Sequence, residues 1–165
     1  MSAVGEMPSF SNKVLNTLAS GWRASATVHM GTGNYLTVST GLDIALSGLP
    51  GNVQRPNQVM DNVYGDGTIG NYLNPNAFEQ PASGTYGNVG PGTIKGPGDV
   101  NFNLGLTRLF RIQERHRVEI RAEAQNVLNT ANFGNPSTAL NSNTFGQINS
   151  AGPGRIVQFA FKYLF

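Results

Sequence analysis

The chain has 165 residues, and only 12% of them are charged, whereas Gly 21 and Pro 9 are high counts for this length. This composition disfavours a helical protein and suits β-strands joined by polar loops. The formal net charge of +2, without lysines and arginines clustered among aromatics, gives no support for a nucleic-acid partner, and the absence of cysteine excludes disulfides and thiolate metal sites.

No run of 18 apolar residues is present, so the sequence predicts no membrane-spanning helix. Residues 1–8 also lack the basic and apolar regions of a signal peptide. If the chain is exported, we expect the export signal to lie upstream, in a longer chain of which this is a part.

Residues 1–20 are weakly patterned and are predicted to form an irregular lead-in on the periplasmic side, with a short helical turn near residues 14–19. From residue 21 onward, apolar and polar side chains alternate strictly in several segments. A period of two places one set of side chains on each face of a β-strand. The predicted strands are residues 22–30, 35–39, 100–107, 117–125 and 157–165.

The segment at residues 117–125 is the most informative of these strands. One face is purely apolar, and the other carries mixed charges that must line water or a polar cavity. We expect a polar ladder on that face, made by Arg117, Glu119, Arg121, Glu123 and Lys162. Residues 117–127 would span roughly 36 Å at about 3.3 Å each, which after a tilt of about 40° approaches the apolar band of about 25 Å on an outer-membrane barrel.

The last strand is apolar or aromatic at every second position and is too hydrophobic for an exposed edge strand in water. Loops alternate long, short and long at residues 40–99, 113–116 and 126–154, which is typical of barrels with long extracellular loops and short periplasmic turns. This topology brings Trp22, Phe110, Tyr163 and Phe165 to the periplasmic end as interfacial aromatics. Arg108 shares the apolar parity, so either its long side chain snorkels at the rim or a bulge shifts the register.

The fold prediction is therefore all-β: about four antiparallel strands of a transmembrane β-barrel, an incomplete barrel with long extracellular loops, over residues 21–165. Four strands cannot close, and open edges in lipid are costly. The alternative is a soluble β-sandwich, such as a carbohydrate-binding or adhesin-like module, which would hide the apolar faces between two sheets.

The long loop at residues 40–99 is rich in turn signals and has no periodicity. Tyr72, Leu73, Phe78 and Tyr86 are expected to pack inward. Four loop residues could contact a ligand or hold the loop folded, and the second role is favoured; these are Arg55, Asn57, Asn74 and Phe78.

No catalytic constellation is evident, and we expect neither an enzyme nor a metal or cofactor. His29 and His116 are the two histidines, and they are expected to be solvated. Glu119 and Glu123 would lie about 13 Å apart on one strand, which is too far for paired-acid catalysis.

An ordered set of short motifs resembles the C-terminal end of Oar-like TonB-dependent receptors, which are bacterial outer-membrane proteins. The motifs are Arg55-Pro-Asn57, Tyr72-Leu-Asn-Pro-Asn-Ala-Phe78, Tyr86-Gly-Asn88, Gly96-Pro-Gly98, Arg121-Ala-Glu123, Asn126-Val-Leu-Asn129, Asn132-Phe-Gly134, Phe145-Gly146 and Gln158-Phe-Ala-Phe-Lys162. Thr130 and Gly154 depart from the usual pattern of that family.

The resemblance implies a place in the outer membrane of a Gram-negative cell, in contact with lipid. It also implies TonB-driven uptake of a bulky nutrient, or an adhesion-related role, with TonB acting only through an upstream plug. The terminal strand looks like the signal read by the barrel-assembly machinery, which can add an edge strand to its own sheet; its residues are Val157, Phe159, Phe161, Tyr163 and Phe165.

Overall fold

The structure is a computed structural model that describes residues 1–112 and 115–165. The turn expected at residues 113–116 lies partly outside the described residues. The chain divides into two compact units, and each is described by itself. The sheet unit comprises Met1–Gly31, Asp99–Ala131 and Pro153–Phe165, and the loop unit comprises Thr32–Gly98 and Asn132–Gly152.

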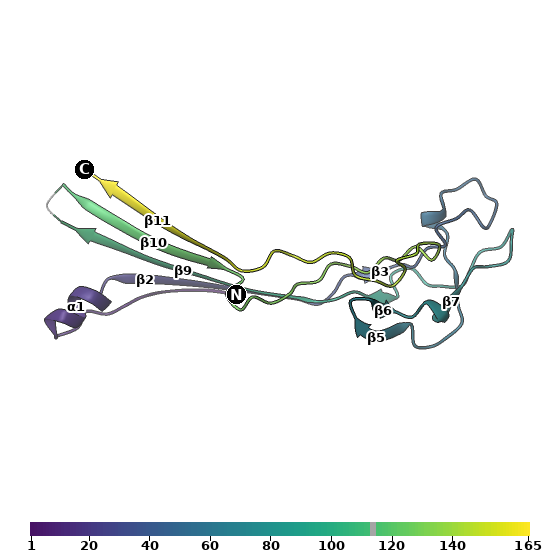
Figure 1. The fold of residues 1–165 in the computed structure, drawn as a ribbon, viewed down its shortest axis with the longest axis horizontal. Helices are drawn as coiled ribbons and strands as arrows, with labels where there is room; N and C mark the ends of the chain where they lie inside the picture. The colour runs from purple at the N-terminus through teal and green to yellow at the C-terminus, as the bar shows by residue number, and fades with distance from the viewer. Residues whose placement is uncertain (113–114) are drawn as a thin grey trace. The chain divides into compact units, whose positions relative to one another are not determined.

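The sheet unit is built on one five-stranded antiparallel sheet with the strand order β1-β2-β9-β10-β11 (Figure 1). Its strands are β1 Ser2–Glu6, β2 Trp22–Gly31, β9 Asp99–Arg111, β10 Arg117–Gln125 and β11 Ile156–Leu164. The four longer strands confirm the segments with the clearest alternation. The all-β antiparallel prediction is therefore confirmed, and the sheet is not closed into a barrel.

β10 ends at Gln125, two residues before the end of the span predicted at residues 117–127. Asn126 adopts a left-handed backbone conformation with φ 48°, which breaks the extended geometry. Its buried side chain then takes over the hydrogen bonding, since Oδ1 accepts from Thr130 N at 3.0 Å and Nδ2 donates to Thr130 O at 2.9 Å.

Residues 1–20 are not an irregular lead-in throughout, which corrects the prediction. β1 pairs with β2 from Ser2 opposite Thr27 to Glu6 opposite Arg23. Ala3 and Gly5 are too small to give a clear apolar alternation, so this strand depends on the edge of β2 and not on its own pattern. The expected helical turn is confirmed as α1, Lys13–Ala19, which begins at Asn12, whose Oδ1 accepts from Val14 N and Leu15 N.

The loop unit contains short paired elements and is not the structureless loop that its turn signals predict. Three two-stranded sheets pair β3 with β8, β4 with β7 and β5 with β6. The elements are β3 Tyr35–Leu36, η1 Gly51–Val53, β4 Asn57–Gln58, β5 Tyr64–Thr68, β6 Asn71–Leu73, η2 Pro75–Ala77, β7 Phe78–Glu79 and β8 Ile94–Lys95. β3 is shorter than the predicted strand at residues 35–39.

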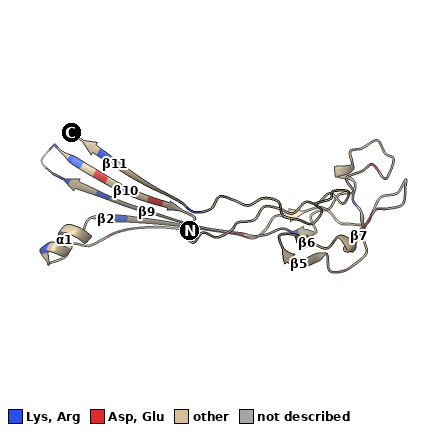
Figure 2. Ribbon diagram, viewed as in Figure 1, with Lys and Arg blue, Asp and Glu red and all other residues tan. Residues whose placement is uncertain are grey.

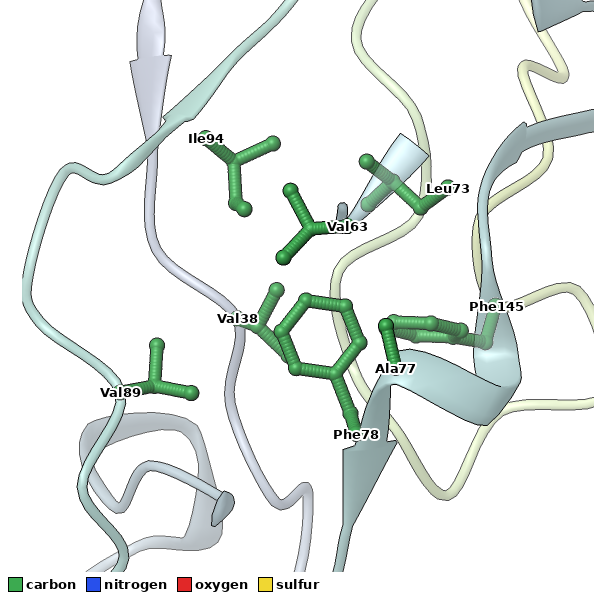
Figure 3. Close-up of a cluster of buried hydrophobic side chains, with 8 residues drawn as sticks. All are labelled: Val38, Val63, Leu73, Ala77, Phe78, Val89, Ile94 and Phe145. Carbon is green, nitrogen blue, oxygen red and sulfur yellow. The ribbon is translucent and has the colours of Figure 1, made fainter. Parts of the chain in front are cut away.

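A small hydrophobic core holds the loop unit together (Figure 3). Its buried members are Val38, Val63, Leu73, Ala77, Phe78, Val89, Ile94 and Phe145. The rings of Phe78 and Phe145 meet edge to face with centroids 5.7 Å apart. Leu73 and Phe78 pack inward as expected, whereas Tyr86 is 65% exposed, so that prediction is wrong.

Close backbone approach explains why glycine occupies a key position in this unit. Gly146 has φ 76°, and a Cβ atom there would lie 2.5 Å from the carbonyl oxygen of Leu73. The carbonyl of Gly146 accepts hydrogen bonds from Tyr72 N at 2.9 Å and Leu73 N at 3.1 Å. The motif at residues 72–78 and the motif Phe145-Gly146 are therefore joined by backbone contacts that only glycine permits.

Candidate functional site

The register of the sheet unit sorts its side chains into two faces, because directly opposed residues in an antiparallel sheet point to the same side. One face is apolar from β2 to β11. Its members are Trp22, Ala24, Ala26, Val28, Met30, Val100, Phe102, Leu104, Leu106, Phe110, Val118, Ile120, Ala122, Ala124, Val157, Phe159, Phe161 and Tyr163. Among the described positions of this face, Arg108 is the one charged residue.

The opposite face is polar and carries charges of both signs. Figure 2 marks the positions of basic residues in blue and acidic residues in red along the strands. The members of the polar face include Glu6, Arg23, Ser25, Thr27, His29, Asp99, Asn101, Asn103, Thr107, Arg111, Arg117, Glu119, Arg121, Glu123, Gln125, Gln158 and Lys162. A sheet with such different faces separates an apolar environment from a polar one.

Arg121 is the centre of the polar ladder. Its Nη2 atom lies 2.8 Å from Glu119 Oε1, and its Nη1 atom lies 3.5 Å from Glu123 Oε1. One guanidinium therefore bridges the two carboxylates on its own strand. Lys162 stands directly opposite Glu119, and Arg117 stands opposite Leu164 at the strand end. The structure thus brings all five predicted ladder residues to one face.

Small residues beside Arg121 leave a recess of about 430 Å³ in the polar face. Gly105 and Ser25 line it together with the side chains of Arg23 and Thr107. At the far end of this face, His29 Nε2 lies 3.2 Å from Asp99 Oδ2. This histidine is therefore exposed but paired, and the polar face offers both hydrogen-bond donors and acceptors to whatever fills the space beside it.

The apolar face of β11 is uncovered. Val157, Phe159, Phe161, Tyr163 and Phe165 are 51%, 80%, 70%, 48% and 92% exposed. A contiguous row of exposed aromatic side chains is unfavourable in water. It is favourable against hydrocarbon, as on the outer wall of a membrane barrel.

Aromatic side chains gather at one end of the apolar face, which we call the aromatic rim: Trp22, Phe110, Tyr163 and Phe165. Tyr163 and Phe110 both stand opposite Val118, in the row next to that of Trp22. The Tyr163 hydroxyl and His116 Nδ1 are 2.6 Å apart, and the two rings stack with centroids separated by 5.8 Å. His116 thus ties the start of β10 to the end of β11, a contact that the sequence pattern did not predict.

Arg108 lies at the aromatic rim without a bulge, since its pairing with Trp22 and Ile120 continues the register on both sides. Its guanidinium lies 4.4 Å from the centre of the Phe110 ring and 5.6 Å from that of Trp22. The guanidinium also donates to the carbonyls of Leu18 at 2.8 Å and Thr17 at 2.6 Å. Of the two predicted explanations, the structure shows the long side chain reaching out from the rim.

The four possible loop contacts are largely occupied within the loop unit. Asn74 caps η2, its Oδ1 accepting from Asn76 N at 3.0 Å, and Asn57 Oδ1 accepts from Asn88 N at 3.3 Å. Phe78 is 5% exposed in the core. Arg55 differs, because its Nε atom is buried without a hydrogen-bond partner.

Asp43 and Gln54 organise an exposed apolar loop in the same unit, which the sequence pattern did not single out. The Asp43 carboxylate accepts from Ser47 N at 3.1 Å, from Gly48 N at 2.8 Å and from the Gln54 amide. These bonds, with that from Gln54 first, hold the pKa of Asp43 below its ordinary value.

Among residues 1–112 and 115–165, no group of three or more His, Cys, Asp or Glu side chains is arranged to hold a metal ion. In that same part of the chain, no helix has the length and apolar character needed to cross a membrane.

An antiparallel sheet with one exposed apolar face and one charged face is the wall of a membrane β-barrel. Comparison with known proteins agrees: residues 1–158 match the family described as outer membrane beta barrel domain, and the chain belongs to this family. No curated protein and no solved structure matches the chain. Membership of an outer-membrane barrel family replaces the soluble β-sandwich alternative.

Proposed function

We propose that these strands form part of the wall of an Oar-like TonB-dependent receptor in the outer membrane of a Gram-negative cell. In this proposal, the receptor takes up a bulky nutrient, and TonB supplies the energy for the uptake. The observation that carries this proposal is the charged polar face, with Glu119, Arg121 and Glu123 at its centre. A mixed-sign ladder needs a hydrated or protein-filled lumen, and large transporters have a plugged one.

The free edges of β1 and β11 support a barrel that is completed by further strands. Unpaired backbone groups are costly in hydrocarbon, so both edges require partners. In this proposal, those strands and the plug belong to a longer chain. TonB contacts the plug, and the strands described here contact lipid on one face and the plug or water on the other.

The wall has no catalytic role in this proposal and needs no cofactor. Glu119 and Glu123 share one arginine and therefore serve as a charge ladder. In the loop unit, Arg55 is the candidate for a ligand contact among the four predicted residues, because its Nε is one of two buried side-chain atoms, with Gln80 Oε1, that the described residues leave without a hydrogen-bond partner.

TonB coupling is tested by labelling adjacent residues on opposite faces. These 165 residues contain no cysteine, so Thr107→Cys introduces their one thiol on the polar face and Leu106→Cys introduces it on the apolar face; any cysteine elsewhere in the receptor is replaced by serine. With a water-soluble maleimide, we expect Thr107→Cys to react and its rate to change when TonB is deleted, because the plug rearranges during transport. Leu106→Cys should remain unreactive. A rate at Thr107→Cys that is the same with and without TonB would refute the coupling but leave the barrel intact.

Recognition by the assembly machinery is a separate part of the proposal. The alternating aromatics of β11 support it, since an edge strand with regular side chains can extend another sheet. We expect deletion of Phe165 to reduce the amount assembled in the outer membrane, whereas Tyr86→Ala, at an exposed position of the loop unit, should not. Equal assembly of both variants would argue against a terminal signal.

A further inference from the structure

The short helix α1 stands at the aromatic rim, and its larger apolar side chains are exposed. Val14, Leu15 and Leu18 are 65%, 51% and 68% exposed. They lie on one side of the helix at the spacing i, i+1 and i+4, while Lys13, Asn16 and Thr17 lie on the other. The helix is therefore amphipathic, with its apolar side uncovered.

Two side chains of the apolar face hold the C-terminal end of α1. Trp22 Nε1 donates to the carbonyl of Leu18 at 3.0 Å, and the Arg108 guanidinium donates to the carbonyls of Leu18 and Thr17. These carbonyls would otherwise lack partners at the end of a helix, and a cation there is favourable. Because Trp22 and Arg108 both point from the apolar face, α1 is fastened on the lipid side of the wall and not over the polar face.

The segment before the helix continues the apolar surface. Met7 and Phe10 are 48% and 37% exposed, and Phe10 N donates to Asn16 Oδ1 at 3.0 Å. A helix of seven residues is too short to be stable by itself in water. The caps of the helix and the contacts from Trp22 and Arg108 fix its ends. Its apolar side stays exposed, which is unfavourable in water.

We propose that α1 is an interfacial anchor that lies in the lipid headgroup layer beside the aromatic rim. The occupant of its apolar side is the boundary between headgroups and acyl chains, because that surface continues directly from the lipid-facing wall. Lys13 supplies a cation for lipid phosphate. The inference depends on the membrane wall and not on TonB coupling.

The test uses single cysteines carrying a nitroxide in the assembled protein, reconstituted in vesicles of phosphatidylethanolamine and phosphatidylglycerol. Leu15→Cys reports the apolar side of α1, and Thr17→Cys is the matched control on its polar side. Phe161→Cys and Thr107→Cys report the two faces of the wall. We expect collisions with a water-soluble nickel chelate to be several-fold rarer at position 15 than at position 17, and collisions with oxygen at position 15 to approach those at position 161.

Each other outcome has a distinct meaning. Equal nickel accessibility at positions 15 and 17 overturns the anchor. Shielding of position 15 from both nickel and oxygen places protein over the helix and overturns lipid as the occupant. If position 161 is itself open to nickel, the membrane wall is wrong and the failure is not specific to α1.

A second pair of variants tests the attachment of the helix. Arg108→Gln and Trp22→Phe each remove donors to the Leu18 carbonyl, and Trp22→Phe does so while keeping an aromatic side chain at this position. We expect either change to increase the mobility of a nitroxide at position 15 and leave that at position 161 unchanged. Unchanged mobility at position 15 in both variants would refute the attachment.

Discussion

The two faces of β11 allow a sharp test, because Phe159 and Gln158 are adjacent in sequence and point to opposite sides. Phe159 stands opposite Ala122 near the middle of the strand, and Gln158 stands opposite Glu123. We consider Phe159→Arg and Gln158→Arg, which introduce the same charge one residue apart. If the apolar face meets hydrocarbon, only the first change should be severe.

The expected loss follows from the exposure of Phe159. Full burial of a phenylalanine side chain contributes up to about 3 kcal/mol, and Phe159 is 80% exposed to the surrounding medium, so its contact with lipid contributes about 2 kcal/mol. An arginine near the middle of the bilayer costs about 2–4 kcal/mol more. The total loss is about 4–6 kcal/mol, which lowers the folding equilibrium constant by roughly three to four orders of magnitude.

The control should behave in the opposite way. An arginine at position 158 would face Glu123, and Gln158 Nε2 already lies 3.5 Å from Glu123 Oε2. We expect a change of less than about 1 kcal/mol, as for an exposed ion pair. The measurement is urea unfolding of the assembled barrel in lipid vesicles. Comparable destabilisation by both variants, or tolerance of Phe159→Arg, would refute the assignment of the two faces.

Three further predictions concern the loop unit. Phe78→Ala should lower its free energy of unfolding by about 3–5 kcal/mol, because a buried ring is lost, whereas the exposed Tyr86→Ala should have little effect; protease resistance of the loop distinguishes them. The lowered pKa of Asp43 means that its stabilisation is present above the ordinary carboxyl range and is lost as pH falls through the lowered pKa. Amide exchange near Asp43 should therefore accelerate in acid, and Asp43→Asn should remove that pH dependence; persistence of the dependence would implicate another group. Gly84→Ala should cost about 1–2 kcal/mol for its positive φ alone, since nothing lies within 4 Å of its Cβ position. Gly146→Ala should cost more because it also meets Leu73; equal losses in thermal unfolding would show that the close approach has no energetic effect.

Much of the sheet could be predicted because alternation is a local property of the chain. The nine residues Arg117–Gln125 alternate between apolar and polar side chains. This alternation alone shows that one face of the strand is apolar and the other charged, without tertiary information. The resemblance to outer-membrane receptors rests on motifs that the structure connects by backbone contacts, as between Leu73 and Gly146.

The remaining features depend on contacts between residues far apart in the sequence. Phe78 and Tyr86 are both aromatic residues in a loop without hydrophobic periodicity. Only the fold decides that Phe78 enters the core while Tyr86 stays exposed. The ladder shows a similar limit, because its composition predicts ion pairing but not that Arg121 bridges two glutamates on its own strand.

The sequence by itself thus determined the four long strands, their two faces and a membrane wall, because each follows from side chains two residues apart. Only the tertiary structure shows the fifth strand of the sheet, because β1 is stabilised by hydrogen bonds to β2 and has little alternation of apolar and polar residues. It also decided how the charge of Arg108 is accommodated on an apolar face. Its guanidinium can be satisfied there because α1, about 90 residues earlier in the chain, presents two free carbonyls at the rim.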